Sequence, residues 1–63
     1  MIGDNLKNIC DKKNITMYQL SKDTGISQSY LSELVNRKAT NPSSKVLIKL
    51  SNYLQIPIDK LVK

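Results

Sequence analysis

Four polar residues, spaced along one face of a short helical stretch, are the side chains of this sequence best suited to recognise another molecule. They are Gln28, Ser29, Ser32 and Glu33, and they lie opposite the apolar positions of the same stretch. Glutamine can form two hydrogen bonds to adenine, serine can bond to several base edges, and a carboxylate can accept from the amino group of cytosine. This is the chemistry of direct contact with DNA bases. For all four residues the alternative is an ordinary solvated helix surface, and for Glu33 it is stronger because phosphates repel a carboxylate.

A basic segment rich in amide and hydroxyl side chains follows these residues. Between residues 34 and 58 there is no acidic residue, whereas Arg37, Lys38, Lys45 and Lys49 are basic. The whole chain carries ten Lys and Arg against five Asp and Glu, a formal net charge of +5. This excess favours a polyanionic partner, and a basic surface that serves only solubility is the alternative.

Other kinds of chemistry find few suitable residues. The chain has no histidine and one cysteine, Cys10, so it offers no metal-ligand set, no internal disulfide and no acid–base constellation. We therefore expect no enzyme activity, no cofactor and no metal. An exposed aromatic platform or a glycine-rich clamp for RNA is also missing. The single cysteine, with no signal peptide and no apolar run of about 18 residues, predicts a cytoplasmic chain without membrane contact.

The elements that position these residues are short helices. Apolar residues recur at helical spacing throughout the 63 residues, and no stretch alternates as a strand would. The pattern predicts an all-α domain of five helices: about 2–13, 17–24 and 28–36, a fourth capped by Ser43 or Ser44, and a short fifth opened by Pro57. Asn14 is expected to end the first helix in the left-handed conformation.

Residues 16–36 have the organisation of a helix-turn-helix motif. Thr16 and Ser27 are expected N-caps of two consecutive helices, and Gly25 permits the tight turn between them. Four apolar residues hold the two helices at a fixed angle: Leu20, Ile26, Leu31 and Leu34. The second helix of such a motif enters the major groove with its first residues.

On these residues the whole chain resembles the Cro/repressor (XRE) family of helix-turn-helix regulators, most closely the N-terminal DNA-binding domains of biofilm repressors. The resemblance is carried by Met1-Ile2-Gly3, Ser29-Tyr30-Leu31-Ser32 and Thr40-Asn41-Pro42-Ser43. It implies a single compact lambda-repressor-like domain over residues 1–63 that binds double-stranded DNA. It also implies a transcriptional regulator, a repressor that acts as a homodimer on a palindromic or repeated operator. A protein antagonist is a further partner that the resemblance allows.

The resemblance implies that Gln28, Ser29 and Glu33 face the bases, and the residue types indicate further roles. The expected base contacts are Gln28, Ser29, Tyr30 and Glu33; for Tyr30, packing at the edge of the core is an equal alternative. Many relatives have glutamine at the position of Met17, so the phosphate contact there falls to Thr16 or to the backbone. The expected phosphate contacts are Thr16, Met17, Ser27, Ser32, Asn36, Arg37, Lys38, Thr40, Asn41 and Ser43. The expected dimer surface is Ile56, Ile58, Leu61 and Val62, although these residues could instead close the core, which is the favoured role for Leu61.

Cys10 and Val35 depart from the family pattern together. Relatives commonly have an Arg–Glu ion pair at these two positions, and replacing a whole buried pair by apolar groups is often neutral. We therefore expect Cys10 and Val35 to pack together beneath the third helix, and we expect no redox role for Cys10. For the whole chain, the alternative function is a protein-interaction module of the same fold, such as an antitoxin or the partner of an anti-repressor.

Overall fold

The computed structural model describes residues 2–39 and 41–62, which form five helices with no β-strand among them. The helices are α1 (Ile2–Lys13), α2 (Met17–Thr24), α3 (Gln28–Val35), α4 (Ser44–Leu54) and α5 (Ile58–Val62). The predicted all-α five-helix fold is confirmed. The third helix ends one residue earlier than predicted, because Asn36 is its C-cap.

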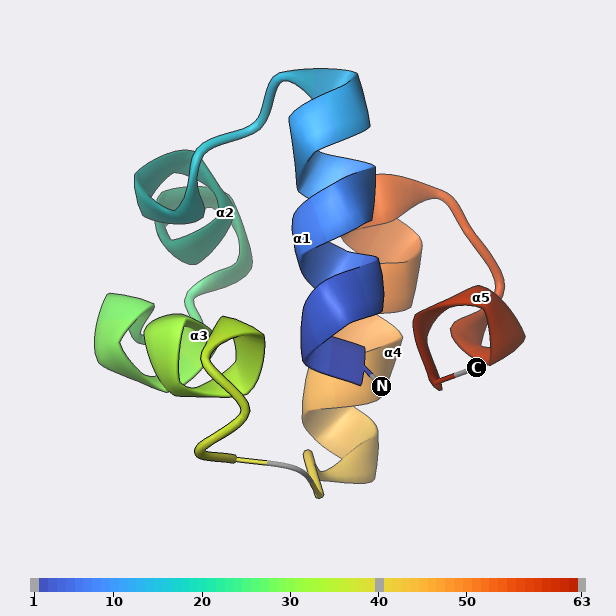
Figure 1. Ribbon diagram of the computed structural model, residues 1–63. Coiled ribbons are helices and arrows are strands. Elements are labelled where there is room, and N and C mark those ends of the chain that lie inside the picture. Colours follow the sequence, from blue (N-terminus) through green and yellow to red (C-terminus); the bar gives the residue numbers. More distant parts are fainter. Residues whose placement is uncertain (1, 40, 63) are drawn as a thin grey trace.

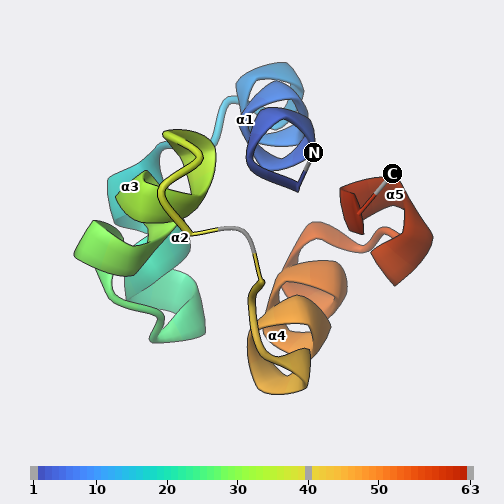
Figure 2. The ribbon, with the colours of Figure 1, turned by 60° about the horizontal axis from the view of Figure 1, so that its bottom comes forward.

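The longest helix, α1, stands at the front of the molecule in Figure 1, with α2 and α3 on one side, α5 on the other and α4 behind it. In the turned view of Figure 2, α1 and α4 lie at opposite ends, with α2 and α3 on one side and α5 on the other. Helix α1 packs against α3 and α5, and α4 packs against α2 and α5. In the part of the chain that the structure describes, ten apolar side chains from all five helices and the α2–α3 turn form one core: Ile2, Leu6, Cys10, Leu20, Ile26, Leu31, Leu34, Leu50, Leu54 and Leu61.

The predicted N-caps begin the helices. The Thr16 hydroxyl accepts a hydrogen bond from the Gln19 amide at 3.0 Å. Ser43, rather than Ser44, caps α4 and accepts from the amide of Val46 at 3.3 Å. Such caps satisfy amides that have no partner within a helix, so they fix where each helix starts.

Left-handed residues end four of the helices. Gly25 has φ 79° and Asn14 has φ 58°, as the sequence predicted. Arg37 (φ 64°) and Gln55 (φ 56°) take the same conformation without being glycine or asparagine. An L-residue with a Cβ pays a steric cost in this conformation, so these two positions carry local strain.

We expect Gln55→Gly to raise the free energy of unfolding by about 1 kcal/mol, because glycine adopts the left-handed conformation without that cost. Gln55 is exposed, so its side chain contributes little packing to offset the gain. Urea denaturation followed by circular dichroism measures the change. Asn14→Gly is the matched control and should gain less, since asparagine tolerates this conformation. A Gln55→Gly protein less stable than the parent would contradict the assignment of strain.

Contacts between helices far apart in sequence complete the fold. The side-chain amide of Asn5 donates to the carbonyl of Leu61 at 2.8 Å and ties α5 to α1. The Tyr53 hydroxyl of α4 donates to the Asp23 carboxylate of α2 at 2.5 Å. This hydrogen bond raises the pKa of Tyr53 above its ordinary value, because it stabilises the protonated phenol.

None of the helices in residues 2–39 and 41–62 combines the length and the apolar character needed to cross a bilayer.

Candidate nucleic-acid interface

Hydrogen bonds across the turn hold α2 and α3 in a fixed relation. The Thr24 hydroxyl donates to the carbonyl of Leu20 at 2.6 Å and accepts from the amide of Ile26 at 3.3 Å. The Ser21 hydroxyl donates to the carbonyl of Ile26 at 2.6 Å. Ile26 itself is buried, so the turn is anchored by both polar and apolar contacts. The helix-turn-helix predicted from the sequence is therefore present over α2 and α3.

The recognition helix candidate, α3, begins at a cap. The Ser27 hydroxyl, predicted as a phosphate contact, accepts from the Tyr30 amide at 3.1 Å and is exposed. Leu31 and Leu34 point into the core and have almost no exposed surface. The opposite face carries the predicted polar residues Gln28, Ser29, Ser32 and Glu33, all of them exposed. The structure therefore brings these four together on one free surface at the start and middle of α3.

Tyr30 occupies the border between that surface and the core. It is half-buried and packs against the buried cluster. This position agrees with the edge-of-core alternative, and its remaining exposed part stays compatible with a DNA contact.

The first flank of this surface is the start of α2. Thr16 is exposed, but its hydroxyl already accepts the Gln19 amide as the helix cap. Met17 is half-buried and packs against the core. Because a thioether offers only a weak acceptor, the polar groups available here are the first amides of α2, which have no partners within the helix.

The second flank is the segment after α3. Asn36, Arg37, Lys38, Asn41 and Ser43 are all exposed, as a phosphate-binding segment requires, and Thr40 lies outside the described residues. The side-chain amide of Asn36 donates to the Ser32 hydroxyl at 3.2 Å. Arg37 does not project freely, because its guanidinium pairs with Asp4 of α1 at 2.7 Å.

The predicted dimer surface divides into buried and exposed residues. Leu61 is 0% exposed and belongs to the core, so it is not available to a second chain; this corrects its inclusion in that surface. Ile56 is half-buried, whereas Ile58 and Val62 are 37% and 45% exposed. Ile48 of α4, which the sequence did not single out, is 50% exposed.

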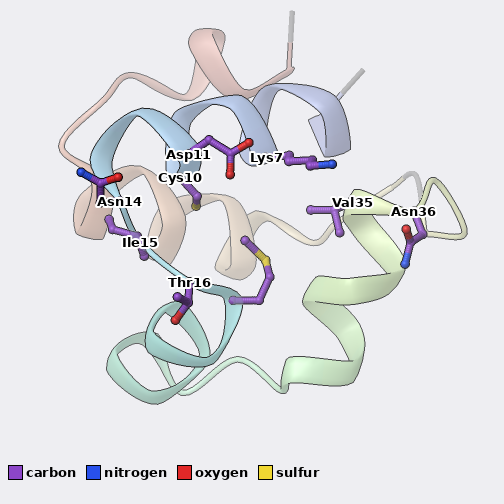
Figure 3. A pocket seen from close by; sticks show the side chains of 9 residues that line it. Lys7, Cys10, Asp11, Asn14, Ile15, Thr16, Val35 and Asn36 are labelled. Atoms are coloured by element: carbon purple, nitrogen blue, oxygen red, sulfur yellow. The ribbon is translucent and has the colours of Figure 1, made fainter.

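A cavity of about 470 Å³ lies between α1, the start of α2 and the end of α3. Cys10 and Val35 both line it (Figure 3), from α1 and from α3 respectively. The two positions therefore share one cavity, and their direct packing stays a prediction. Met17 and Asn36, from the two flanks of the exposed surface, line it as well.

The Cys10 thiol in this cavity is poorly suited to react. It is 1% exposed. Burial raises its pKa above the ordinary value, and the neighbouring Asp11 carboxylate adds to the increase. The raised pKa keeps the thiol protonated near neutral pH. Because the thiolate is the reactive form, the protonated thiol is inert.

Asp4 and Lys7 are two polar residues of this region that the sequence pattern did not indicate. Asp4 pairs with Arg37 across 33 positions of the chain, and Lys7 lines the cavity beside Val35. No local pattern could have found either, since each role depends on how α1 packs against the end of α3. No group of three or more metal-binding side chains occurs within the described residues.

Comparison with known proteins identifies the family of this chain. The helix-turn-helix family model HTH_3 matches residues 6–61. The chain belongs to this family of helix-turn-helix domains, which confirms the resemblance to Cro/repressor regulators.

Its relatives include two regulators from Bacillus subtilis. The HTH-type transcriptional regulator SinR is 32% identical over 62 residues, which cover 98% of this chain and 56% of SinR. The HTH-type transcriptional regulator SlrR is 34% identical over 61 residues, 97% of this chain and 40% of SlrR. The chain thus spans about half the length of these relatives, which are named as transcriptional regulators rather than enzymes.

A solved structure matches the whole fold. The crystal structure of SinR, the master regulator of biofilm formation, in complex with DNA superposes with a TM-score of 0.94 at 32% identity. All of this chain and all of that chain are covered.

Proposed function

We propose that this chain binds double-stranded DNA sequence-specifically, with α3 in the major groove, as part of a cytoplasmic transcriptional regulator. The observation that carries the proposal is the exposed polar start of α3, where Gln28 and Ser29 follow the Ser27 cap. A helix-turn-helix contacts base edges with just these first residues of its second helix. The match to a DNA-bound structure supports this use of the surface.

Two flanks would fix the position of α3 on the duplex. The start of α2 offers the free backbone amides of Met17 and Tyr18, and the segment after α3 offers Asn36, Lys38, Asn41 and Ser43, with Thr40 in the same segment. Phosphate contacts of this kind carry most of the salt-dependent affinity but little sequence information. Glu33 and the exposed part of Tyr30 are further proposed base contacts, and Ser32 is a proposed phosphate contact.

We further propose that the regulator is a repressor and occupies its operator as a homodimer. Half-sites would then lie about one turn of DNA apart. The exposed apolar residues Ile58 and Val62, beside the half-buried Ile56, are the surface proposed for the second copy, and a protein antagonist is a further proposed partner.

A salt titration tests DNA binding against the alternative of a protein-interaction module. With a fluorescently labelled duplex of mixed sequence, the dissociation constant should rise steeply between about 50 and about 200 mM salt, as released counterions require. A flat or absent response would reject DNA binding. The exposed face of α3 is polar, whereas a partner helix in a groove needs apolar anchors, so the surface favours DNA.

Gln28→Ala should separate base reading from phosphate binding. Selection from a random DNA pool first provides the preferred sequence. Fluorescence anisotropy should then show that the variant loses about 1–3 kcal/mol of binding free energy for that sequence and little for random DNA. Lys38→Gln is the matched control and should weaken both by a similar factor. Equal losses on both DNAs for Gln28→Ala would remove Gln28 from the base contacts.

A further inference from the structure

Asp4 and Arg37 form a two-point ion pair across the end of the proposed recognition helix. Nη2 of Arg37 lies 2.7 Å from Oδ2 of Asp4, and Nε lies 3.3 Å from Oδ1. Asp4 stands in the first turn of α1, whereas Arg37 comes two residues after the end of α3. The pair therefore joins the start of the chain to the segment proposed to hold DNA phosphates.

The backbone places Arg37 at a defined point. The Lys38 amide donates to the Glu33 carbonyl at 2.8 Å and the Arg37 amide to the Leu34 carbonyl at 3.2 Å. These two bonds close α3 in a Schellman motif with Arg37 at the left-handed position, which usually holds glycine. The guanidinium thus extends from a fixed turn between Asn36 and Lys38.

Both charged groups remain open to solvent. The side chain of Arg37 is 60% exposed and that of Asp4 is 42% exposed. Exposed ion pairs are weak and are weakened further by salt. A phosphate that approaches this flank would meet the same guanidinium, since arginine binds phosphate and carboxylate through the same planar set of N–H groups.

We propose that Asp4 competes with DNA phosphate for the Arg37 guanidinium and so limits the affinity of this domain for DNA. The proposal rests on the proposed DNA-binding function and adds a regulatory residue to it. Asp4 acts through Arg37 and is a positioning residue. In the parent protein the carboxylate occupies the guanidinium, so binding a phosphate there first requires the ion pair to break.

The test compares four proteins in a mutant cycle: the parent, Asp4→Asn, Arg37→Gln and the double variant. Each is titrated against a labelled duplex of random sequence over a salt series from about 50 to about 200 mM. Asp4→Asn should bind roughly 3- to 10-fold more tightly at the low-salt end, with the slope of log K against log salt steeper by about 0.9, the value for one added phosphate contact. Arg37→Gln should change affinity little in the parent and remove the gain in the Asp4→Asn background.

Two controls separate competition from a general charge effect. Asp11→Asn removes one exposed carboxylate from the same helix as Asp4. It should give a smaller gain in DNA affinity and leave the slope of log K against log salt unchanged. Asp4→Glu, which keeps the carboxylate, should bind like the parent. Thermal melts establish that each variant is folded before it is titrated.

Three results would overturn the proposal. One is a gain for Asp4→Asn no larger than that for Asp11→Asn. Another is a gain that persists in the double variant, since the lost carboxylate alone would then explain it. The third is an Arg37→Gln loss that is equally large with and without Asp4. If the parent shows no salt-dependent binding at all, the proposed function fails, and this result is distinct from the other three.

Discussion

Gly3→Ala should lower the free energy of unfolding by about 2–3 kcal/mol, although alanine is the better helix former. Gly3 is buried in the first turn of α1, and a Cβ there would overlap the carbonyl group of Leu34 and crowd the Cα of Val35. Both are backbone atoms at the end of α3, so no side-chain rotation relieves the overlap. The usual gain of about 1 kcal/mol for alanine over glycine in a helix is therefore outweighed by overpacking.

Gly25→Ala is the matched control, because the chain contains only these two glycines. Nothing lies within 4 Å of a Cβ at Gly25, and the cost there comes from φ +79° alone. It should lose about 1 kcal/mol, the ordinary cost of the left-handed conformation. Urea denaturation of the parent, Gly3→Ala and Gly25→Ala ranks their free energies of unfolding. A Gly3→Ala variant as stable as the parent would mean that α1 does not approach α3 this closely.

Gly3→Ala should also weaken DNA binding if α3 is the recognition helix. Relief of the overlap requires α1 to move away from the end of α3, which displaces the segment that follows it. Anisotropy under conditions where the variant is fully folded measures this effect separately from stability. Unchanged affinity in the folded variant would show that the end of α3 does not set the phosphate contacts.

Val35→Glu should destabilise the domain by about 2 kcal/mol, and Cys10→Arg in the same protein should recover much of the loss. Val35 is half-buried in a cavity whose apolar lining includes Ile15 and Met17, so a carboxylate there loses hydration. Lys7 lines the same cavity, but it is exposed to solvent, so its ammonium group compensates only in part. The cavity of about 470 Å³ has room for the longer arginine side chain that would pair with Glu.

Thermal and urea unfolding of the parent, both single variants and the double variant form the cycle that measures this pairing. Cys10→Arg alone is the matched control and should also be destabilised, since it buries a cation without a partner. Additive losses in the double variant would contradict the shared position of the two residues. Equal stability of Val35→Glu and the double variant would do the same.

Helix starts and most helix ends were predictable because they depend on interactions within three or four residues. The caps at Thr16 and Ser27, and the left-handed turns at Asn14 and Gly25, follow from side chains beside the backbone they satisfy. The left-handed conformation of Arg37 was not predictable from residue type. It follows from the closing hydrogen bonds of α3, and Asp4 on another helix holds the side chain.

The candidate DNA surface was predictable for a related reason. Helical periodicity alone separates Gln28 and Ser29 from the buried Leu31, and it needs no knowledge of neighbouring helices. For the apolar residues near the C-terminus, periodicity does not predict which side chains are buried. Periodicity marks Leu61 and Val62 as apolar without telling which one the rest of the chain covers, and only packing against the other helices buries Leu61.

Local sequence patterns thus specify the helices, the turn between α2 and α3, and the polar face of α3. Packing between helices specifies what lies next to the end of α3: Gly3, Asp4 and the cavity lined by Cys10. The physical reason is the range of the interactions. Hydrogen bonds of caps and turns are local in sequence, whereas the close approach of α1 to α3 brings together residues more than 30 positions apart and exists only once both helices share one core.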